Sequence, residues 1–250
     1  MIDMINKLFN ESNIDTMSKI PDNKIDGILC SPPYNLATKR RDGYYNHGYA
    51  DTDNLPEDEY LELRLNEFKE FERIVKNNGV ICYNMSYHTL NPILPIKLMN
   101  LIHEETNLTL ADIIAWKKSN SMPFQSSATN LSRIVENIYI IVNKGYMKTF
   151  KTNKEISKIN EKTGQKFYKK YDNFIEAPNN DRFKSKLKAS FSSDLVIKLI
   201  DIYFPKGSLI YDPFMGIGTT AKGCILTGRN FIGSELDEEI YQDSIRFLSQ

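Results

Sequence analysis

Two turns marked by proline and glycine, one near each end of the chain, constrain the fold more than any other feature of the sequence. Ser31-Pro32-Pro33-Tyr34 follows the short apolar run Ile25–Cys30, and the glycine-containing stretch Asp212–Thr220 follows the apolar run Ser208–Tyr211. Short apolar runs that end at turn residues are typical of buried strands. Both turns therefore stand at the carboxyl ends of predicted strands, where open α/β sheets bind their ligands.

The rest of the chain alternates between helical and strand patterns. Between Pro56 and Lys76 the apolar residues recur on one helical face, Asn78-Gly79 supplies a stop, and Val80–Met85 has the composition of the next strand. The further predicted elements are a helix over Pro92–Glu104, strands over Asp112–Trp116 and Glu136–Val142, a helix capped by Ser192 or Ser193 that ends at Pro205, a helix over Thr219–Leu226, a strand over Asn230–Gly233 and a helix over Asp237–Leu248. Repeated strand-helix-strand units predict one α/β domain over residues 1–250, with a doubly wound, mostly parallel sheet.

The composition is typical of a globular protein. The chain has 250 residues, of which 41% are hydrophobic, so it can bury one full core. No apolar run approaches the ~20 residues that cross a bilayer, and Met1–Asn10 lacks the basic-then-apolar layout of a signal peptide. The widely spaced Cys30, Cys82 and Cys224 indicate buried reduced thiols rather than a disulfide or a metal site. We expect a cytoplasmic protein, or a nuclear one if the host has a nucleus, that contacts no membrane and holds no metal.

A basic segment interrupts an otherwise acidic chain. Lys144–Lys188 contains 13 Lys and Arg against 5 Asp and Glu, a net charge of +8, and since the whole chain is neutral the remainder carries −8. A basic stripe on an acidic body is typical of a surface that faces phosphates, and Lys169 and Lys170 are candidate contacts. The alternative is an ordinary solvated, lysine-rich surface. The scarcity of long apolar runs predicts a separate, partly flexible lobe.

The glycine turn has the features of a cofactor site. Gly216 and Gly218 carry no Cβ, so a ligand can approach their backbone closely. Glu235 follows Gly218 by 17 residues at the end of the next predicted strand, where a carboxylate can accept hydrogen bonds from ribose hydroxyls. Asp212 suits a ligand with a positive ammonium group and would repel a pyrophosphate, and position 221 is Ala where the dinucleotide fingerprint has its third glycine. A nicotinamide site, a tight packing turn and a helix-capping role for Asp212 remain as alternatives.

The two turns carry a resemblance to a known family. The matching residues are Ser31-Pro-Pro-Tyr34, Asp212-Pro-Phe-x-Gly-x-Gly-Thr-Thr, Gly228-Arg229, Ile232-Gly233-x-Glu235 and Tyr241. In this order they resemble the β arrangement of the DNA amino-methyltransferases, which normally have Ser where Ile217 stands. The resemblance implies a Rossmann-like methyltransferase fold, S-adenosylmethionine as cofactor and an inserted target-recognition region over 117–190. The residues implied for cofactor binding are Asp212, Phe214, Gly216, Gly218, Thr219, Thr220 and Glu235.

Under this resemblance the Pro-Pro turn is the catalytic turn. The lone pair of an exocyclic base amine is delocalised into the ring, so acceptors aimed at its hydrogens would favour attack on the sulfonium methyl. The Ser31 side chain and the Pro32 carbonyl, held by a turn that Pro33 stiffens, are the candidate acceptors. Tyr34 offers a flat face on which an extruded base can stack. The alternative is a proline turn that is merely packed by an aromatic residue.

Ser at the first position is more typical of cytosine-N4 enzymes, whereas Asp is commoner in adenine-N6 enzymes, so we predict cytosine N4 and keep adenine N6 as the alternative. Cytosine-C5 chemistry needs a cysteine nucleophile in a Pro-Cys turn, and the chain has no Pro-Cys pair. Arg40, Arg41 and Tyr44, on the long polar stretch after the catalytic turn, are candidate DNA contacts.

The predicted partner is double-stranded DNA in a restriction-modification setting. A homodimer and a companion restriction endonuclease stay open. Two rival functions also stay open: methylation of an RNA base or a protein amide, and a DNA-binding module that has lost catalysis. The presence of Ser31, Tyr34, Asp212 and Glu235 speaks against the inactive module.

Overall fold

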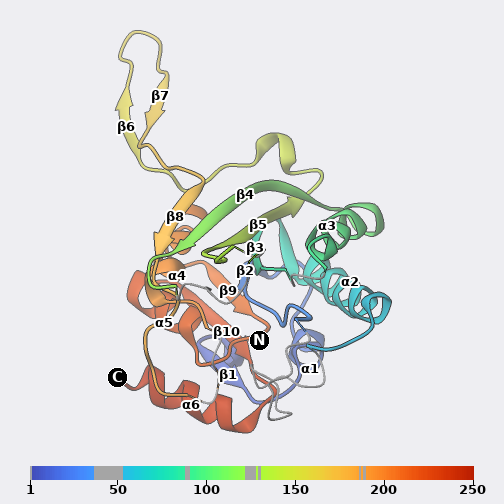
Figure 1. Ribbon diagram of the computed structural model, residues 1–250. Helices are drawn as coiled ribbons and strands as arrows, with labels where there is room; N and C mark the ends of the chain where they lie inside the picture. The colour runs from blue at the N-terminus through green and yellow to red at the C-terminus, as the bar shows by residue number, and fades with distance from the viewer. Residues whose placement is uncertain are drawn as a thin grey trace.

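An eight-stranded mixed sheet forms the centre of the molecule (Figure 1). The structure is a computed structural model that describes residues 2–36, 53–87, 91–121, 128, 131–185, 187 and 190–250. The strands are β1 (Lys7–Phe9), β2 (Ile25–Cys30), β3 (Val75–Met85), β4 (Leu108–Lys118), β5 (Val135–Asn143), β8 (Phe174–Ala177), β9 (Leu209–Asp212) and β10 (Asn230–Ser234). Their order is β1-β10-β9-β2-β3-β5-β4-β8, and β5 alone among them runs antiparallel to its neighbours.

Helices cover both faces of this sheet. They are α1 (Asn13–Ser18), α2 (Glu57–Ile74), α3 (Leu94–Glu105), α4 (Ser193–Tyr203), α5 (Thr219–Thr227) and α6 (Glu238–Leu248), with short 3₁₀ turns η1 (Ile2–Met4) and η2 (Met147–Thr149). One buried cluster joins the sheet to α1, α2 and α3, and the other joins it to α4 and α5. Successive residues of β3 alternate between them, since Ile81 and Tyr83 belong to the first cluster and Val80 and Cys82 to the second. The predicted doubly wound, mostly parallel α/β fold is therefore confirmed.

Most predicted elements lie within a few residues of their expected bounds, and β3 shows the clearest difference. The sequence predicts a break at Asn78-Gly79 between helix and strand, whereas β3 already begins at Val75. The register against β2 shifts here, because Ile25 pairs with Val75 and Gly27 pairs with Val80. The Asn-Gly pair therefore marks an irregularity inside the strand rather than the end of the helix.

The basic segment is not a separate lobe throughout, so that prediction is wrong for β8. β8 pairs in parallel with β4, with Trp116 opposite Ile175, and the Trp116 indole Nε1–H donates to the Ala177 carbonyl at 3.1 Å. Between β5 and β8 the chain forms a two-stranded hairpin of β6 (Ile156–Ile159) and β7 (Lys166–Tyr168). Figure 1 shows this hairpin projecting from the body.

Three further observations complete the fold. β1 pairs with β10 at the edge of the sheet, and neither β1 nor α1 is predicted by the sequence patterns. Cys30, Cys82 and Cys224 are buried free thiols, as expected. Among the described residues, no helix has the length and apolar character needed to span a membrane.

Candidate active site

The catalytic turn and the glycine turn lie side by side. β2 and β9 are neighbours in the sheet, with Ile28 opposite Tyr211, so the turns that follow them emerge at the same edge. A cavity of about 330 Å³ is lined by all four residues of the Ser31–Tyr34 turn. A smaller hollow of about 40 Å³ adjoins it, because Ser31 and Pro33 line both, and extends along the glycine turn. The structure therefore brings the two sets of predicted site residues together.

The glycine turn depends on backbone conformations that glycine adopts readily. Gly216 and Gly218 have φ values of +55° and +89°, in the left-handed region that other residues rarely occupy. The Gly216 N–H donates to Glu235 Oε2 at 2.9 Å, which ties the turn to the end of β10. Gly218 immediately precedes α5, so the turn opens directly into the first residues of that helix.

Asp212 is almost fully buried at the end of β9. Its Oδ1 accepts a hydrogen bond from the Phe214 N–H at 2.9 Å, and its Oδ2 accepts one from the Thr220 hydroxyl at 2.6 Å. Burial raises the pKa of Asp212 to about 7, with the negative charge of Glu235 adding to the increase and both hydrogen bonds opposing it. The carboxylate therefore fixes the turn to the first turn of α5, which supports part of the alternative in which Asp212 has a capping role.

The remaining predicted cofactor residues lie along the same turn. Phe214 is half-buried, and the guanidinium carbon of Arg64 lies 5.2 Å from the centre of its ring. Thr219 lines the smaller hollow together with Gly216 and Ile217. Ile217, which stands where the family normally has Ser, is buried. Six of the seven predicted residues thus lie on one continuous stretch of chain, and Glu235, directly after β10, is the seventh.

The polar side chains of the catalytic turn form a network with residues from other strands. The Ser31 Oγ lies 2.7 Å from the Tyr34 hydroxyl, which donates to Glu136 Oε2 at 3.2 Å. The Asn84 side-chain amide donates to Glu136 Oε2 at 2.9 Å and also to the Tyr34 hydroxyl. Lys118 forms an ion pair with Glu136 Oε1. Burial raises the pKa of the Tyr34 phenol, and the nearby Glu136 charge raises it further.

Asn84, Lys118 and Glu136 are site residues that the sequence analysis misses. Each lines the cavity, and they come from β3, β4 and β5. Glu136 reaches this edge because β5 runs antiparallel, so that the start of β5 meets the carboxyl ends of β3 and β4. The only sequence signal is that Glu136 begins one predicted strand and Lys118 follows another by two residues, and their pairing depends on a register that no local pattern reveals.

A buried ion pair on α2 underlies both turns. Arg64 Nη1 lies 3.0 Å from Glu67 Oε2, and both side chains are almost completely buried. Besides facing the Phe214 ring, the Arg64 guanidinium carbon lies 5.3 Å from the centre of the Tyr60 ring. The Tyr60 hydroxyl donates to the Pro33 carbonyl at 2.9 Å. Arg64 therefore contacts the glycine turn directly and the catalytic turn through Tyr60.

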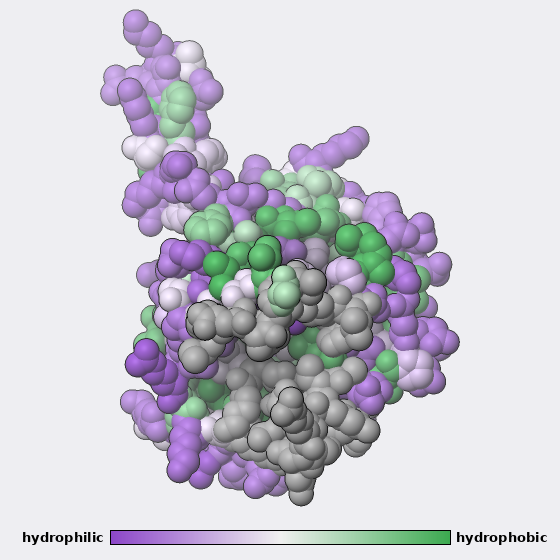
Figure 2. Space-filling view, in the orientation of Figure 1, coloured by the Kyte–Doolittle hydropathy of each residue, from purple (hydrophilic) through white to green (hydrophobic). Residues whose placement is uncertain are grey.

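Lys169 and Lys170, the predicted DNA-binding residues that the structure describes, do not line the cavity. They lie in the chain just after β7, where they form exposed ion pairs with Glu155 and Asp172. The hairpin that precedes them is mostly hydrophilic in Figure 2. Arg40, Arg41 and Tyr44 lie outside the described residues, so their predicted role remains a prediction.

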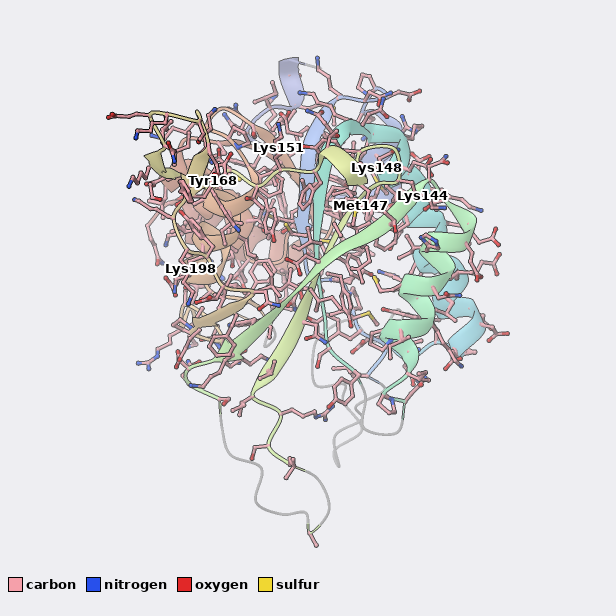
Figure 3. The ribbon with its side chains drawn as sticks, turned by 90° about the horizontal axis from the view of Figure 1, so that it is seen from above. Lys144, Met147, Lys148, Lys151, Tyr168 and Lys198 are labelled. Carbon is pink, nitrogen blue, oxygen red and sulfur yellow. The ribbon has the colours of Figure 1, made fainter. Side chains whose placement is uncertain are left out.

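The first lysines of the basic segment lie at the other end of the sheet. Figure 3 shows Lys144 and Lys148 close together beyond the end of β5, where Asn143 pairs with Leu108, and Lys151 farther along the chain. β5 has 9 residues, so this end is roughly 30 Å from the cavity end. The Lys144 ammonium donates to two carbonyls at the end of α3, those of His103 and Thr106. The basic segment is therefore not one continuous surface beside the cavity.

The mouth of the cavity presents a cation and exposed apolar side chains instead. Arg133 lies over the ring of Tyr87, with its guanidinium carbon 5.5 Å from the ring centre, and both line the cavity. Val135 also lines the cavity and is 40% exposed. Figure 2 shows hydrophobic surface gathered over β4 and β5 on this face.

An open, mostly parallel sheet with a glycine turn beside a polar cavity defines the class of α/β proteins that bind ligands at the carboxyl ends of their strands. Comparison with known proteins narrows this class. The family described as DNA methylase, of the N6 and N4 type, matches residues 25–246. The chain therefore belongs to the N6/N4 DNA methylase family.

Individual relatives agree with this family. The chain is 26% identical to the type II methyltransferase M2.MboI of Moraxella bovis, over 96% of this chain and 86% of that protein. Among solved structures, the cytosine-N4-specific PvuII DNA methyltransferase matches with a TM-score of 0.73 at 18% identity. The match covers 96% of this chain and 84% of the PvuII chain. The M1.HpyAVI complex with SAM has a TM-score of 0.67 at 22% identity, over 98% of this chain and 99% of that one. These structural likenesses establish the fold.

Proposed function

We propose that this chain transfers a methyl group from S-adenosylmethionine to an exocyclic amine of a base in DNA. The observation that carries the proposal is the adjacency of the two turns, since Ser31 and Pro33 line both the large cavity and the hollow along the glycine turn. A cofactor held by the glycine turn and a base held in the cavity would meet at these residues. The family membership and the SAM complex of M1.HpyAVI support the cofactor.

The residues of each turn have separate roles in this proposal. The Asp212 and Glu235 carboxylates would bind the ammonium group and the ribose hydroxyls of the cofactor, and the absence of a Cβ at Gly216 and Gly218 would allow its close approach. The Ser31 hydroxyl and the Pro32 carbonyl accept hydrogen bonds from the target amine. Attack of the amine nitrogen forms the new N–CH₃ bond as the S–CH₃ bond breaks, the sulfonium becomes a neutral thioether, and the amine proton leaves to solvent.

Cytosine N4 is the proposed target, and adenine N6 is the second candidate. Ser31 at the head of the turn supports cytosine, as does the likeness to a structure described as cytosine-N4-specific. The lining of the cavity includes apolar residues, such as Pro32 and Trp116, and polar residues, such as Asn84 and Glu136. Such a lining suits an extruded base that stacks through its ring and forms hydrogen bonds through its edge.

Double-stranded DNA is the proposed substrate, recognised in part by the region 117–190. Arg133 and Tyr87 at the mouth of the cavity are additional contacts, because a cation beside an aromatic ring suits a phosphate next to an unstacked base. Lys169 and Lys170 would contact phosphates farther along the duplex. A cytoplasmic location, a homodimer and a companion endonuclease remain predictions, the last in keeping with the type II name of M2.MboI.

Mass spectrometry of nucleosides tests the proposal. The protein is incubated with methyl-labelled S-adenosylmethionine and unmethylated genomic DNA, which offers many different sequences, and with RNA in a parallel reaction. We expect labelled N4-methylcytosine from DNA, whereas labelled N6-methyladenine would establish the second candidate. The matched control is Tyr34→Ala, which lacks the stacking ring and should form much less product. Absence of any labelled DNA nucleoside from the wild-type reaction would overturn the proposal.

A further inference from the structure

The carboxylate of Glu136 lies at the end of a hydrogen-bonded chain that begins at the catalytic serine. We propose that Glu136 is a positioning residue that orients the Ser31 hydroxyl, through Tyr34, so that its lone pairs face the target amine. The inference rests on the proposed function and deepens it by assigning a role to a side chain on β5, far in sequence from either turn.

The hydrogen-bonded chain from Ser31 to Glu136 consists of two contacts. The Ser31 Oγ and the Tyr34 hydroxyl are 2.7 Å apart, and the Tyr34 hydroxyl is 3.2 Å from Glu136 Oε2. The side chain of Glu136 is 13% exposed, so these contacts lie in a partly dehydrated environment. Electrostatic hydrogen bonds are stronger in such surroundings than in water, and consecutive bonds polarise one another.

The chemistry of the groups sets the direction of this chain. An ionised carboxylate can only accept hydrogen bonds, and a bond from a hydroxyl to a carboxylate is stronger than one between two hydroxyls. The Tyr34 hydrogen therefore points to Glu136. The Tyr34 oxygen is then left as the acceptor, and the Ser31 hydrogen points to it. The lone pairs of Ser31 consequently remain on the side away from Tyr34.

Asn84 reinforces this direction. Its amide group donates to Glu136 Oε2 at 2.9 Å and to the Tyr34 hydroxyl, so both of these oxygens act as acceptors toward Asn84 and the Tyr34 hydrogen stays directed at Glu136. Its contact with Ser31 Oγ, at 3.4 Å, is the longest of the three. Lys118 pairs with the other carboxylate oxygen of Glu136, which balances the charge and leaves Oε2 to Tyr34 and Asn84.

The orientation of Ser31 matters because a hydroxyl and an amine can both act as hydrogen-bond donors. A target amine presents two hydrogens, and a serine hydrogen directed at it would repel it instead of accepting from it. An oriented acceptor costs no rearrangement when the amine arrives, which is the general advantage of preorganised groups in catalysis. Removing the carboxylate while keeping its shape should therefore slow the chemical step more than it weakens binding.

If Glu136 had only a structural role, its replacement would have different effects. If Glu136 only neutralised Lys118, its loss would lower stability or disturb DNA binding independently of the Tyr34 hydroxyl. Glu136→Gln retains the size of the side chain, and its amide can donate to the Tyr34 hydroxyl and reverse the chain. Tyr34→Phe retains the ring face and interrupts the same chain at its middle. The two substitutions should therefore not be independent.

A double-mutant cycle on the rate of single-turnover methyl transfer to DNA tests the proposal. Glu136→Gln should slow transfer roughly 10- to 100-fold in the wild-type background, with the affinities for DNA and S-adenosylmethionine unchanged. In the Tyr34→Phe background the same substitution should have little further effect. The matched control is Glu70→Gln, which removes a carboxylate partner of Arg73 on α2, outside both the cavity and the region 117–190, and should keep the wild-type rate.

Two outcomes would overturn the proposal. One is a full transfer rate in Glu136→Gln, and the other is an equal slowing by Glu136→Gln in the wild-type and Tyr34→Phe backgrounds. If Glu136→Gln fails to fold, Tyr34→Phe alone carries the test, because a full rate in that variant would show that the chain is not needed. Failure of the wild-type protein to methylate DNA would instead contradict the proposed function, so the two failures are distinguishable.

Discussion

The two turns at the edge of the sheet differ in where their polar groups find partners. In the glycine turn, the Asp212 carboxylate accepts hydrogen bonds from Phe214 and Thr220 within the same stretch of chain, and Glu235, directly after β10, accepts one from Gly216. In the catalytic turn, Ser31 and Tyr34 depend on side chains from β3 and β5. The glycine turn is a compact local unit, whereas the catalytic turn is completed by side chains from strands distant in sequence.

This difference separates the two functions of the proposed enzyme. Cofactor binding depends on a turn that largely holds itself in shape, so substitutions among the cavity residues should leave it intact. Methyl transfer depends on residues from several strands and should respond to any of them. Arg64 is the exception, because it packs on Phe214 and, through Tyr60, on the catalytic turn.

Replacing Arg64 should impair cofactor binding and methyl transfer together, because Arg64 supports both turns. It should also produce the largest effect on stability. Arg64→Met leaves the buried Glu67 carboxylate without its ion-pair partner, which costs about 3–5 kcal/mol of unfolding free energy. Urea denaturation measures the change. The control is Lys198→Met, which removes an exposed pair with Asp194 on α4 and should cost well under about 1 kcal/mol. Equal effects of the two substitutions would show that Arg64 does not stabilise the site.

The pH dependence of stability tests whether Asp212 is held in the dry interior of the glycine turn. Its pKa is raised from 3.8 to about 7, so the folded state binds more protons than the unfolded state between these values. Stability from this group is present below about pH 4 and is lost as the pH rises through about 7, about 4 kcal/mol in total. Urea denaturation at pH 5 and pH 8 should show a larger loss in the wild type than in Asp212→Asn. An identical loss in both proteins would contradict the raised pKa.

Cofactor affinity tests the assignment of the glycine turn. Asp212→Ala and Glu235→Ala should each weaken S-adenosylmethionine binding by about 1–3 kcal/mol, the cost of losing a charge-assisted hydrogen bond. Calorimetry measures the affinity, and Glu176→Gln serves as the control with unchanged binding. If neither alanine variant binds more weakly, the turn is not the cofactor site.

The salt dependence of DNA binding sharpens the contrast between the two parts of the basic segment. Substituting Gln for both Lys169 and Lys170 should reduce the slope of log affinity against log salt by about one unit for each lysine that neutralises a phosphate. The matched control substitutes Gln for Lys148 and Lys151, which Figure 3 places at the far end of β5. We expect the wild-type slope in the control. An equal reduction of the salt slope in both variants would show that the two parts of the basic segment do not differ in their contribution to DNA binding.

The fold is largely predictable from the sequence because its signals are local. The apolar run Ile25–Cys30 forms β2 with the predicted bounds, and the helix after Gly218 starts at Thr219 as expected. The sequence patterns miss β8 because its four residues alternate between exposed and buried and acquire their partner only through pairing with β4. They miss the short edge strand β1 for the same reason, since β1 is held by β10 from the opposite end of the chain.

Of the two turns that make up the candidate site, only the glycine turn is fully predictable from the sequence. Asp212, Gly216 and Gly218 lie close together in sequence, and their spacing reflects the geometry of one turn. The partners of Ser31 and Tyr34 cannot be predicted in the same way, because Asn84 and Glu136 meet only through the antiparallel register of β3 and β5. A site assembled from several strands leaves no fixed spacing in the chain.

The most direct test of the central claim, that the catalytic turn performs chemistry separately from cofactor binding, is single-turnover methyl transfer by Ser31→Ala. The substitution keeps the Pro-Pro turn and removes one acceptor for the target amine. We predict transfer to DNA slowed by about 10²-fold or more, together with unchanged calorimetric affinity for S-adenosylmethionine. A full rate of transfer by Ser31→Ala would contradict the account.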